Sequence, residues 1–195
     1  MMGTVKRIDL DDALRVVTGG GAFVDLRAVP EYLDAHIKGS LSLQYEFGPG
    51  MQQRARDCIP LDVPLVVLDQ GEHDVTEVGA ALRGKGFAVV GVVERGLDAW
   101  IEAHGAPATT PLIPESPKPE GTLLSVGDPG SLRLDDALFI PITELWARVD
   151  EVPTDERVTV VAGRGVRAAL AVGILERAGI DDIAMWQSRP RRRSV

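Results

Sequence analysis

Short apolar runs alternate with amphipathic stretches along the first hundred residues. The expected strands are 22–26, 65–69 and 88–93, and the expected helices are 8–17, 75–87 and 96–105. Asp9 stands where a helix cap is needed, and Gly84 or Gly86 is placed to end the second helix. Strands that alternate with helices in this way predict an α/β fold, with a small, mainly parallel sheet flanked by helices on both faces.

The same pattern returns in the second half, displaced by 93 positions, as from Pro60 to Pro153. Its expected strands are 123–126, 158–162 and 183–186, and its expected helices are 142–152 and 166–179. Three further pairs fall on matching structural junctions without a gap: Asp62 with Asp155, Leu82 with Leu175, and Gly86 with Gly179. The repeat indicates a duplicated α/β unit.

Five prolines in residues 107–119 separate the two halves. Proline fixes φ and lacks a backbone N–H, so we expect neither helix nor sheet to run through this stretch. The predicted organisation is a first domain at 1–106, a Pro-rich linker at 107–120, a shortened second domain at 121–188 and a basic tail at 189–195. Both halves are small, so we expect them to lean on each other.

The formal net charge is −8 even with the four arginines of the basic tail included, so the rest of the chain is still more acidic. An acidic chain disfavours nucleic acid as a partner. We interpret this tail as solvated, with contact to phosphates or to an acidic surface as the alternative. No apolar run is long enough to span a membrane, and we expect a cytoplasmic protein. A single cysteine, Cys58, excludes an intrachain disulfide and a multi-cysteine zinc site; no cofactor is expected.

Several motifs resemble the rhodanese family of sulfurtransferases. FVDLRAVPEYLDAHIKGSLSL at 23–43 is similar to that family's strand with Asp-x-Arg, its Glu-Tyr helix and its His-Ile-x-Gly-Ala motif, and RGLDAW at 95–100 is similar to its closing motif. In the second half, LFIPITELWARVDEVP and VVAGRGVRAA resemble the helix and loop of the active site more weakly, and LLSVGD lacks Asp-x-Arg. The resemblance implies two rhodanese-like domains in tandem.

Active members of that family carry a nucleophilic cysteine where the strand ends and a loop wraps its sulfur with backbone N–H groups. The resemblance implies that this position is Asp69 in the first loop and Ala162 in the second. Both lack the sulfur, so we expect the protein to be catalytically inactive as a sulfurtransferase.

The first loop is acidic and consists of Asp69, Gln70, Gly71, Glu72, His73 and Asp74. We interpret its carboxylates as solvated or as helix caps, and we expect no metal there. Two alternatives remain open, a divalent metal site and an aspartyl nucleophile of a hydrolase or phosphatase.

The second loop keeps what an anion site needs: glycines, amides at a helix start, and arginines. Its residues are Gly163, Arg164, Gly165, Val166 and Arg167. We expect reversible binding of a small oxyanion here, with a purely structural loop as the alternative.

Three other features bear on chemistry. Cys58 precedes a strand and is interpreted as an inert small residue; the alternative is a relocated nucleophile whose pKa is lowered by Arg54 and Arg56. Asp25 and Arg27 are expected to form a structural pair near the first loop. His36 is expected to serve packing and hydrogen bonding.

The sequence therefore predicts a binding or regulatory module for a small oxyanion or a protein partner. The rivals are an enzyme, either a sulfurtransferase that uses Cys58 or a hydrolase that uses the Asp69 loop, and a purely structural protein. The oligomeric state is left open.

Overall fold

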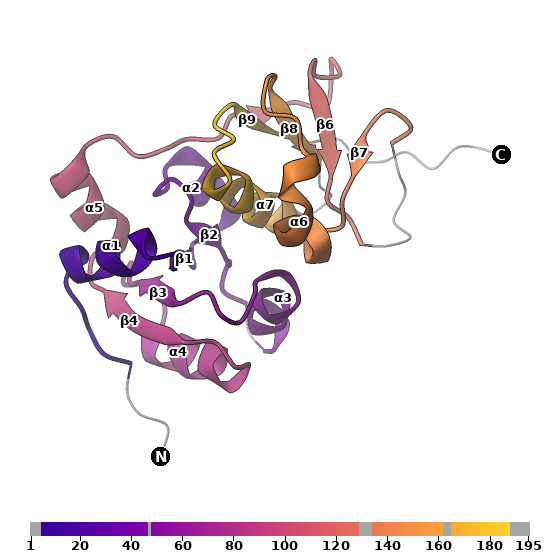
Figure 1. Cartoon of the computed structure of the whole chain (residues 1–195). Helices are drawn as coiled ribbons and strands as arrows, with labels where there is room; N and C mark the ends of the chain where they lie inside the picture. The colour runs from indigo at the N-terminus through magenta and orange to yellow at the C-terminus, as the bar shows by residue number, and fades with distance from the viewer. Residues whose placement is uncertain (1–4, 47, 129–133, 162–164, 188–195) are drawn as a thin grey trace.

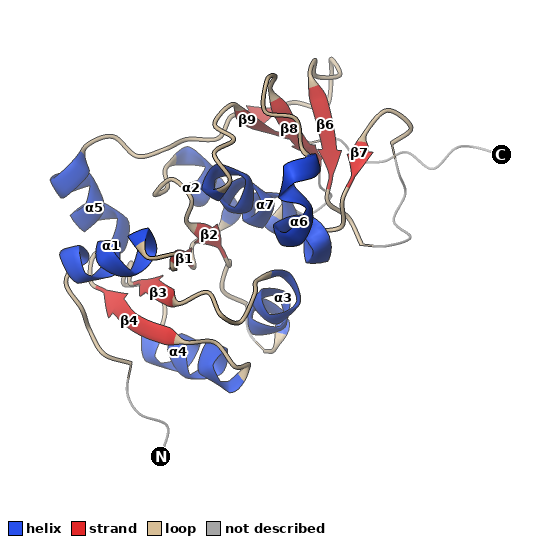
Figure 2. Ribbon diagram, viewed as in Figure 1, coloured by secondary structure: helices blue, strands red, loops and turns tan. Residues whose placement is uncertain are grey.

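The computed structural model describes residues 5–46, 48–128, 134–161 and 165–187, which form two parallel sheets with helices packed on them (Figures 1 and 2). The first sheet has the order β2-β1-β3-β4, and the second has the order β5-β9-β8-β6-β7. All pairings between these strands are parallel. The predicted parallel α/β architecture is therefore confirmed for both halves.

Helices cover both faces of the first sheet. Its strands are β1 (Ala22–Asp25), β2 (Leu41–Ser42), β3 (Leu65–Leu68) and β4 (Val89–Val93). Its helices are α1 (Leu10–Thr18), α2 (Val29–Asp34), α3 (Gly50–Cys58), α4 (Val75–Gly84) and α5 (Gly96–His104). α1 and α5 pack on one face around Phe23 and Val66, whereas α2, α3 and α4 pack on the face of Val24 and Val67. The predicted cap is confirmed, because the Asp9 side chain accepts from the N–H of Asp12.

The second sheet differs from the expectation of helices on both faces. Its strands are β5 (Leu112–Ile113), β6 (Thr122–Ser125), β7 (Leu138–Phe139), β8 (Val158–Val161) and β9 (Ile183–Trp186), and its helices are α6 (Ile142–Arg148), the 3-10 turn η1 (Val149–Glu151) and α7 (Val166–Arg177). Both α6 and α7 join the core on the face of Val158 and Val160. Around Val161 and Trp186, on the opposite face, the described neighbours come from coil segments and from β5.

The Pro-rich segment contains a strand, contrary to our expectation. β5 pairs with β9 at the edge of the second sheet. In this pairing the carbonyls of Pro111 and Ile113 accept from the N–H groups of Met185 and Gln187. Proline lacks an N–H but keeps its carbonyl, so the flanking prolines do not interrupt the pairing. The same segment is bound to the first half, because Ala108 and His36 exchange backbone hydrogen bonds of 2.9 Å. It therefore joins the halves as an ordered strip.

α7 lies between the two halves and is buried on all sides. Every residue from Ala168 to Leu175 is buried, and one apolar core extends across α7 from the first sheet to the second. Figure 1 shows α7 beside α2 and β2. At Gly173 the backbones meet so closely that an added Cβ would lie 2.0 Å from the carbonyl oxygen of Ser40.

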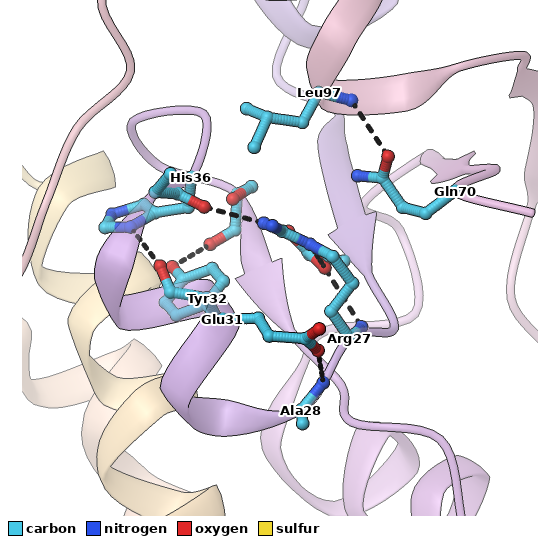
Figure 3. A network of polar contacts seen from close by, with 10 residues as sticks. Arg27, Ala28, Glu31, Tyr32, His36, Gln70 and Leu97 are labelled. Atoms are coloured by element: carbon cyan, nitrogen blue, oxygen red, sulfur yellow. Dashed lines mark hydrogen bonds and ion pairs between the residues drawn. The ribbon is translucent and has the colours of Figure 1, made fainter. Parts of the chain in front are cut away.

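A buried polar cluster accompanies this contact. His36 is fully buried, and its Nε2 lies 3.0 Å from Oε1 of Glu176, at the end of α7. Oε2 of Glu176 accepts from the N–H of Gly39 at 2.6 Å. Nδ1 of His36 lies 2.8 Å from the carbonyl oxygen of Tyr32, which can only accept, so Nδ1 carries a hydrogen (Figure 3). One further hydrogen must therefore lie between Nε2 and Glu176.

We expect Gly173→Ala to destabilise the protein by at least about 2 kcal/mol, because a methyl group cannot fit between α7 and Ser40. Gly84→Ala is the matched control. It also lies in a helix, but its Cβ would meet no atom within 4 Å, so we expect a change between zero and about 1 kcal/mol of stabilisation. Urea unfolding of both variants measures the difference, and equal stabilities would contradict the close contact.

We expect Glu176→Ala to cost about 3 kcal/mol, because it leaves His36 buried without its partner. Glu176→Gln should cost far less. Its amide can donate to Nε2 of a neutral His36 while its oxygen accepts from Gly39, so every hydrogen bond is kept. Equal losses in the two variants, measured by urea unfolding, would show that the hydrogen-bond network does not stabilise the contact.

Candidate functional site

The acidic loop 69–74 lies at the carboxyl end of β3, a central strand of the first sheet, directly before α4. The edge formed by the carboxyl ends of parallel strands is where α/β folds place their ligand sites. Leu26 and Arg27 follow the neighbouring strand β1 and line a cavity with residues of the loop. The structure thus brings the predicted loop and the predicted Asp25–Arg27 pair together.

The carboxylate of Asp69 is engaged within the protein. Oδ1 accepts from the N–H of Gly71 at 2.9 Å, and Oδ2 lies 3.3 Å from Nη1 of Arg7. Arg7 also pairs with Glu94 at 2.5 Å. The Asp69 carboxylate therefore already occupies the N–H of Gly71, which would otherwise be free to bind an anion.

Asp74 occupies the start of α4 in the same manner. Its side chain accepts from the N–H groups of Thr76 and Glu77, at 2.9 and 3.2 Å. These amides are the positive end of the helix, where an anion would otherwise bind. The interpretation of Asp74 as a helix cap is confirmed.

Gln70 ties the loop to the start of α5, and Arg27 lines the same cavity (Figure 3). Oε1 of Gln70 accepts from the N–H of Leu97 at 3.3 Å, and its Nε2 is buried without a partner among the described residues. Arg27 donates to Asp25 at 2.6 Å and to the carbonyl of Ala35 at 2.7 Å. Burial opposes the charge of Arg27, but the hydrogen bond with Asp25 raises its pKa above the ordinary value.

The cavity under the loop has room for about one water molecule, at about 10 Å³. Its lining residues are Leu26, Arg27, Leu68, Gln70, Glu72, His73 and Val75. The ring of His73 stacks on that of Tyr45, with centroids 4.5 Å apart, and Nε2 of His73 lies 4.0 Å from Oε2 of Glu72. Within the described parts of the chain, no group of three or more His, Cys, Asp or Glu side chains is placed to hold a metal ion.

The second loop is described only from Gly165 onward; Ala162, Gly163 and Arg164 lie outside the described residues. Gly165 has a φ of 86°, and no side chain caps the start of α7. An added Cβ at Gly165 would lie 3.4 Å from the Val29 side chain, so this loop faces the first half. Nη2 of Arg167 lies 2.6 Å from Oδ2 of Asp128, and both side chains are about half exposed.

Cys58 ends α3 and is 5% exposed. Burial, with a smaller effect from Asp57, raises the pKa of its thiol to about 11, and the opposing effect of Arg54 is weaker. Burial therefore argues against a thiol activated by the nearby arginines. The interpretation of Cys58 as an inert, buried residue is supported.

Sequence reasoning missed three contacts: Arg7 with Asp69, Gln70 with the start of α5, and Glu176 with His36. The spacing Asp69-x-Gly71 is a local signal for the observed turn, since Asp side chains often bond the N–H two residues on. No comparable signal marks Arg7 or Glu176, because their partners lie 62 and 140 positions away in the chain.

No helix in the described parts of the chain is both long and apolar enough to cross a membrane. A comparison with curated proteins gave no match. Solved structures that resemble this chain include the thiosulfate sulfurtransferase of Pseudomonas aeruginosa, with 20% identity, a TM-score of 0.44, and 94% of this chain and 41% of that chain covered. This chain therefore spans 41% of that protein's length.

Two further structures are similar at comparable scores. The 3-mercaptopyruvate sulfotransferase SseA of Escherichia coli has 16% identity and a TM-score of 0.42, with 96% of this chain and 100% of that chain covered. The NAD-dependent persulfide reductase of A. fulgidus has 28% identity and a TM-score of 0.36, with 40% and 15% covered. Among family models, that of the rhodanese-like domain matches residues 9–103. The matched range contains the acidic loop, Arg27 and His36.

Proposed function

We propose that this protein is a tandem rhodanese-like protein that does not transfer sulfur and acts as a binding or regulatory module. The observation that carries this proposal is the carboxylate of Asp69, which stands at the end of β3 and accepts from Gly71. A nucleophilic sulfur is expected at this position in active relatives. Here a fixed negative charge fills the cradle in its place, so an anionic substrate is repelled.

The rival enzymes fit the geometry less well. Cys58 is buried, and a thiol with a pKa of about 11 supplies very little thiolate near neutral pH. An aspartyl nucleophile must be accessible to its substrate, whereas the Asp69 side chain is 16% exposed and its oxygens are engaged by Gly71 and Arg7. Neither group supports covalent catalysis.

The ligand that we assign to the second loop is a small oxyanion at the start of α7, with a protein partner as the alternative. α7 is 12 residues long, and no described side chain caps its start, whereas the side chain of Asp74 caps α4. Arg167 stands at the start of α7, half exposed. Its ion pair with Asp128 would compete with a bound anion.

In assays of sulfur transfer from thiosulfate and from 3-mercaptopyruvate to cyanide, we expect no thiocyanate above the blank. Cys58→Ala should behave identically, because the buried thiol is not the nucleophile. Activity that disappears in Cys58→Ala would overturn the proposal in favour of a relocated thiol. Activity that survives in Cys58→Ala but disappears in Asp69→Ala would overturn it in favour of the first loop.

Titration with thiosulfate or phosphate should shift the amide NMR signals of Val166 and Arg167 saturably. Asp128→Asn should strengthen binding, because it releases Arg167 from its ion pair, and Arg167→Gln should weaken it. The amides of Gly71 and Thr76 are an internal control, since carboxylates already occupy them. Unchanged signals at α7 would rule out the oxyanion and leave the protein partner.

A further inference from the structure

A groove of about 350 Å³ lies between α2 and the residues that lead into β5. It is lined by Pro30, Leu33, Asp34, Thr109, Thr110, Pro111 and Leu112. The N–H of Thr110 donates to the carbonyl of Leu33 at 2.8 Å, so the two walls are bonded to each other. Leu112 is 45% exposed, although it is a large apolar residue within a strand. The groove therefore offers apolar surface between two walls that are held together.

The groove lies where one more strand of the second sheet would lie. β5 is the end strand of that sheet, and within the described strands it pairs with β9. Leu112 is opposite Met185, which belongs to the core on the α7 face, whereas Ile113 packs on the other face with Trp186. The side chain of Leu112 is therefore on the face that α2 borders. A strand added about 4.8 Å beyond β5 would enter the groove and meet α2.

The main chain of Leu112 is available for such a strand. The carbonyls of Pro111 and Ile113 accept from Met185 and Gln187, so the pairing with β9 uses the residues on either side of Leu112. The N–H and C=O of Leu112 therefore point away from β9, and no described residue bonds them. In an antiparallel pair, one residue opposite Leu112 would exchange both of these hydrogen bonds.

The open edge is only one residue long. On one side, the N–H of Thr110 is already bonded to Leu33, and on the other side Pro114 has no N–H, while its carbonyl accepts from Trp186. A long open edge pairs with almost any extended chain, whereas a short one is selective. Side-chain contacts in the groove must therefore decide which segment binds.

The charge of the groove favours a basic segment. Among the described residues that line it, Asp34 alone carries a charge; it is exposed and forms no ion pair with another described residue. A second copy of the chain would bring a net charge of −8 toward this carboxylate. A lysine or arginine of another protein complements it instead.

We propose that this groove is a docking site for an extended, basic segment of a partner protein. The segment pairs with β5 opposite Leu112 and places one apolar side chain against Leu33 and Leu112. Side chains two positions apart on a strand share a face, so a lysine or arginine two positions away lies toward Asp34. This surface is separate from the second loop, and the inference is independent of the oxyanion site and of the absence of sulfur transfer.

A synthetic peptide of seven residues, blocked at both ends, is the probe. It carries lysine, valine and lysine at its second, fourth and sixth positions and threonine elsewhere, so the valine and both lysines share one face. In NMR titrations of the full chain, it should shift the amide signals of Leu112 and Leu33 saturably. N-methylation of the valine removes one hydrogen-bond donor and should weaken binding about fivefold. Glutamate in place of both lysines should weaken it about threefold or more.

A charge reversal in the protein provides the matched test. Asp34→Lys should weaken binding of the lysine peptide about threefold or more and strengthen binding of the glutamate peptide. Asp150→Lys is the control, because it changes the net charge equally at an exposed carboxylate on η1, outside the groove. It should leave the preference for the lysine peptide unchanged. A general loss of structure would weaken both peptides, so an exchanged preference identifies contact with Asp34.

Several outcomes would overturn the proposal. The lysine peptide could give no saturable shift at millimolar concentration, or it could bind no better than the N-methylated or the glutamate peptide. A Leu112 signal that moves with protein concentration, without any peptide, would assign the edge to a second copy of the chain. A Leu112 signal that moves on removal of the basic tail, residues 189–195, would assign the edge to the chain itself.

Discussion

The fold depends on the burial of α7 between two sheets. In the described part of the chain, the helices of the second sheet, α6 and α7, pack on one of its faces, and the first half of the chain covers them there. At Gly173 the backbone of α7 contacts that of Ser40 directly, so at this point no side chain separates the two halves. At the end of the helix, Arg177 donates to the carbonyls of Gly20 and Gly21 at 3.1 and 2.8 Å. α7 thus completes the core of both halves.

This arrangement gives the two loops different chemistry, although both follow a strand and precede a helix. In the first, Asp69 and Asp74 bond the amides that a cradle would offer to a ligand. In the second, the start of α7 carries no side-chain cap and faces Val29 of the first half. Internal carboxylates occupy the positions in the first loop where an external anion would otherwise bind. The first half of the chain therefore borders the start of α7.

Periodic patterns and local caps were readable from the sequence, whereas contacts between distant segments were not. The strands β1, β3, β4, β6, β8 and β9 and the helices α1, α4, α5, α6 and α7 follow apolar spacing, and Asp9 and Asp74 are caps with local signals. α3 was missed because Met51, Ala55 and Cys58 are the few buried residues in a polar stretch. β5 was missed because prolines flank it. One overlooked signal was available: 166–175 is apolar almost all round, which is typical of a helix buried on every side.

The polar cluster at the end of α7 selects one docking arrangement among the many that apolar faces permit. A displaced helix would leave Glu176 buried without His36 and Gly39, at a cost that apolar contacts do not recover. Gly165 lies 11 positions before Glu176, about 16 Å along a continuous helix. The cluster fixes the position of α7 along its axis, and the position of Gly165 against Val29 follows from it. A hydrogen-bond network at one end of the helix therefore helps to position the residue that begins it at the other end.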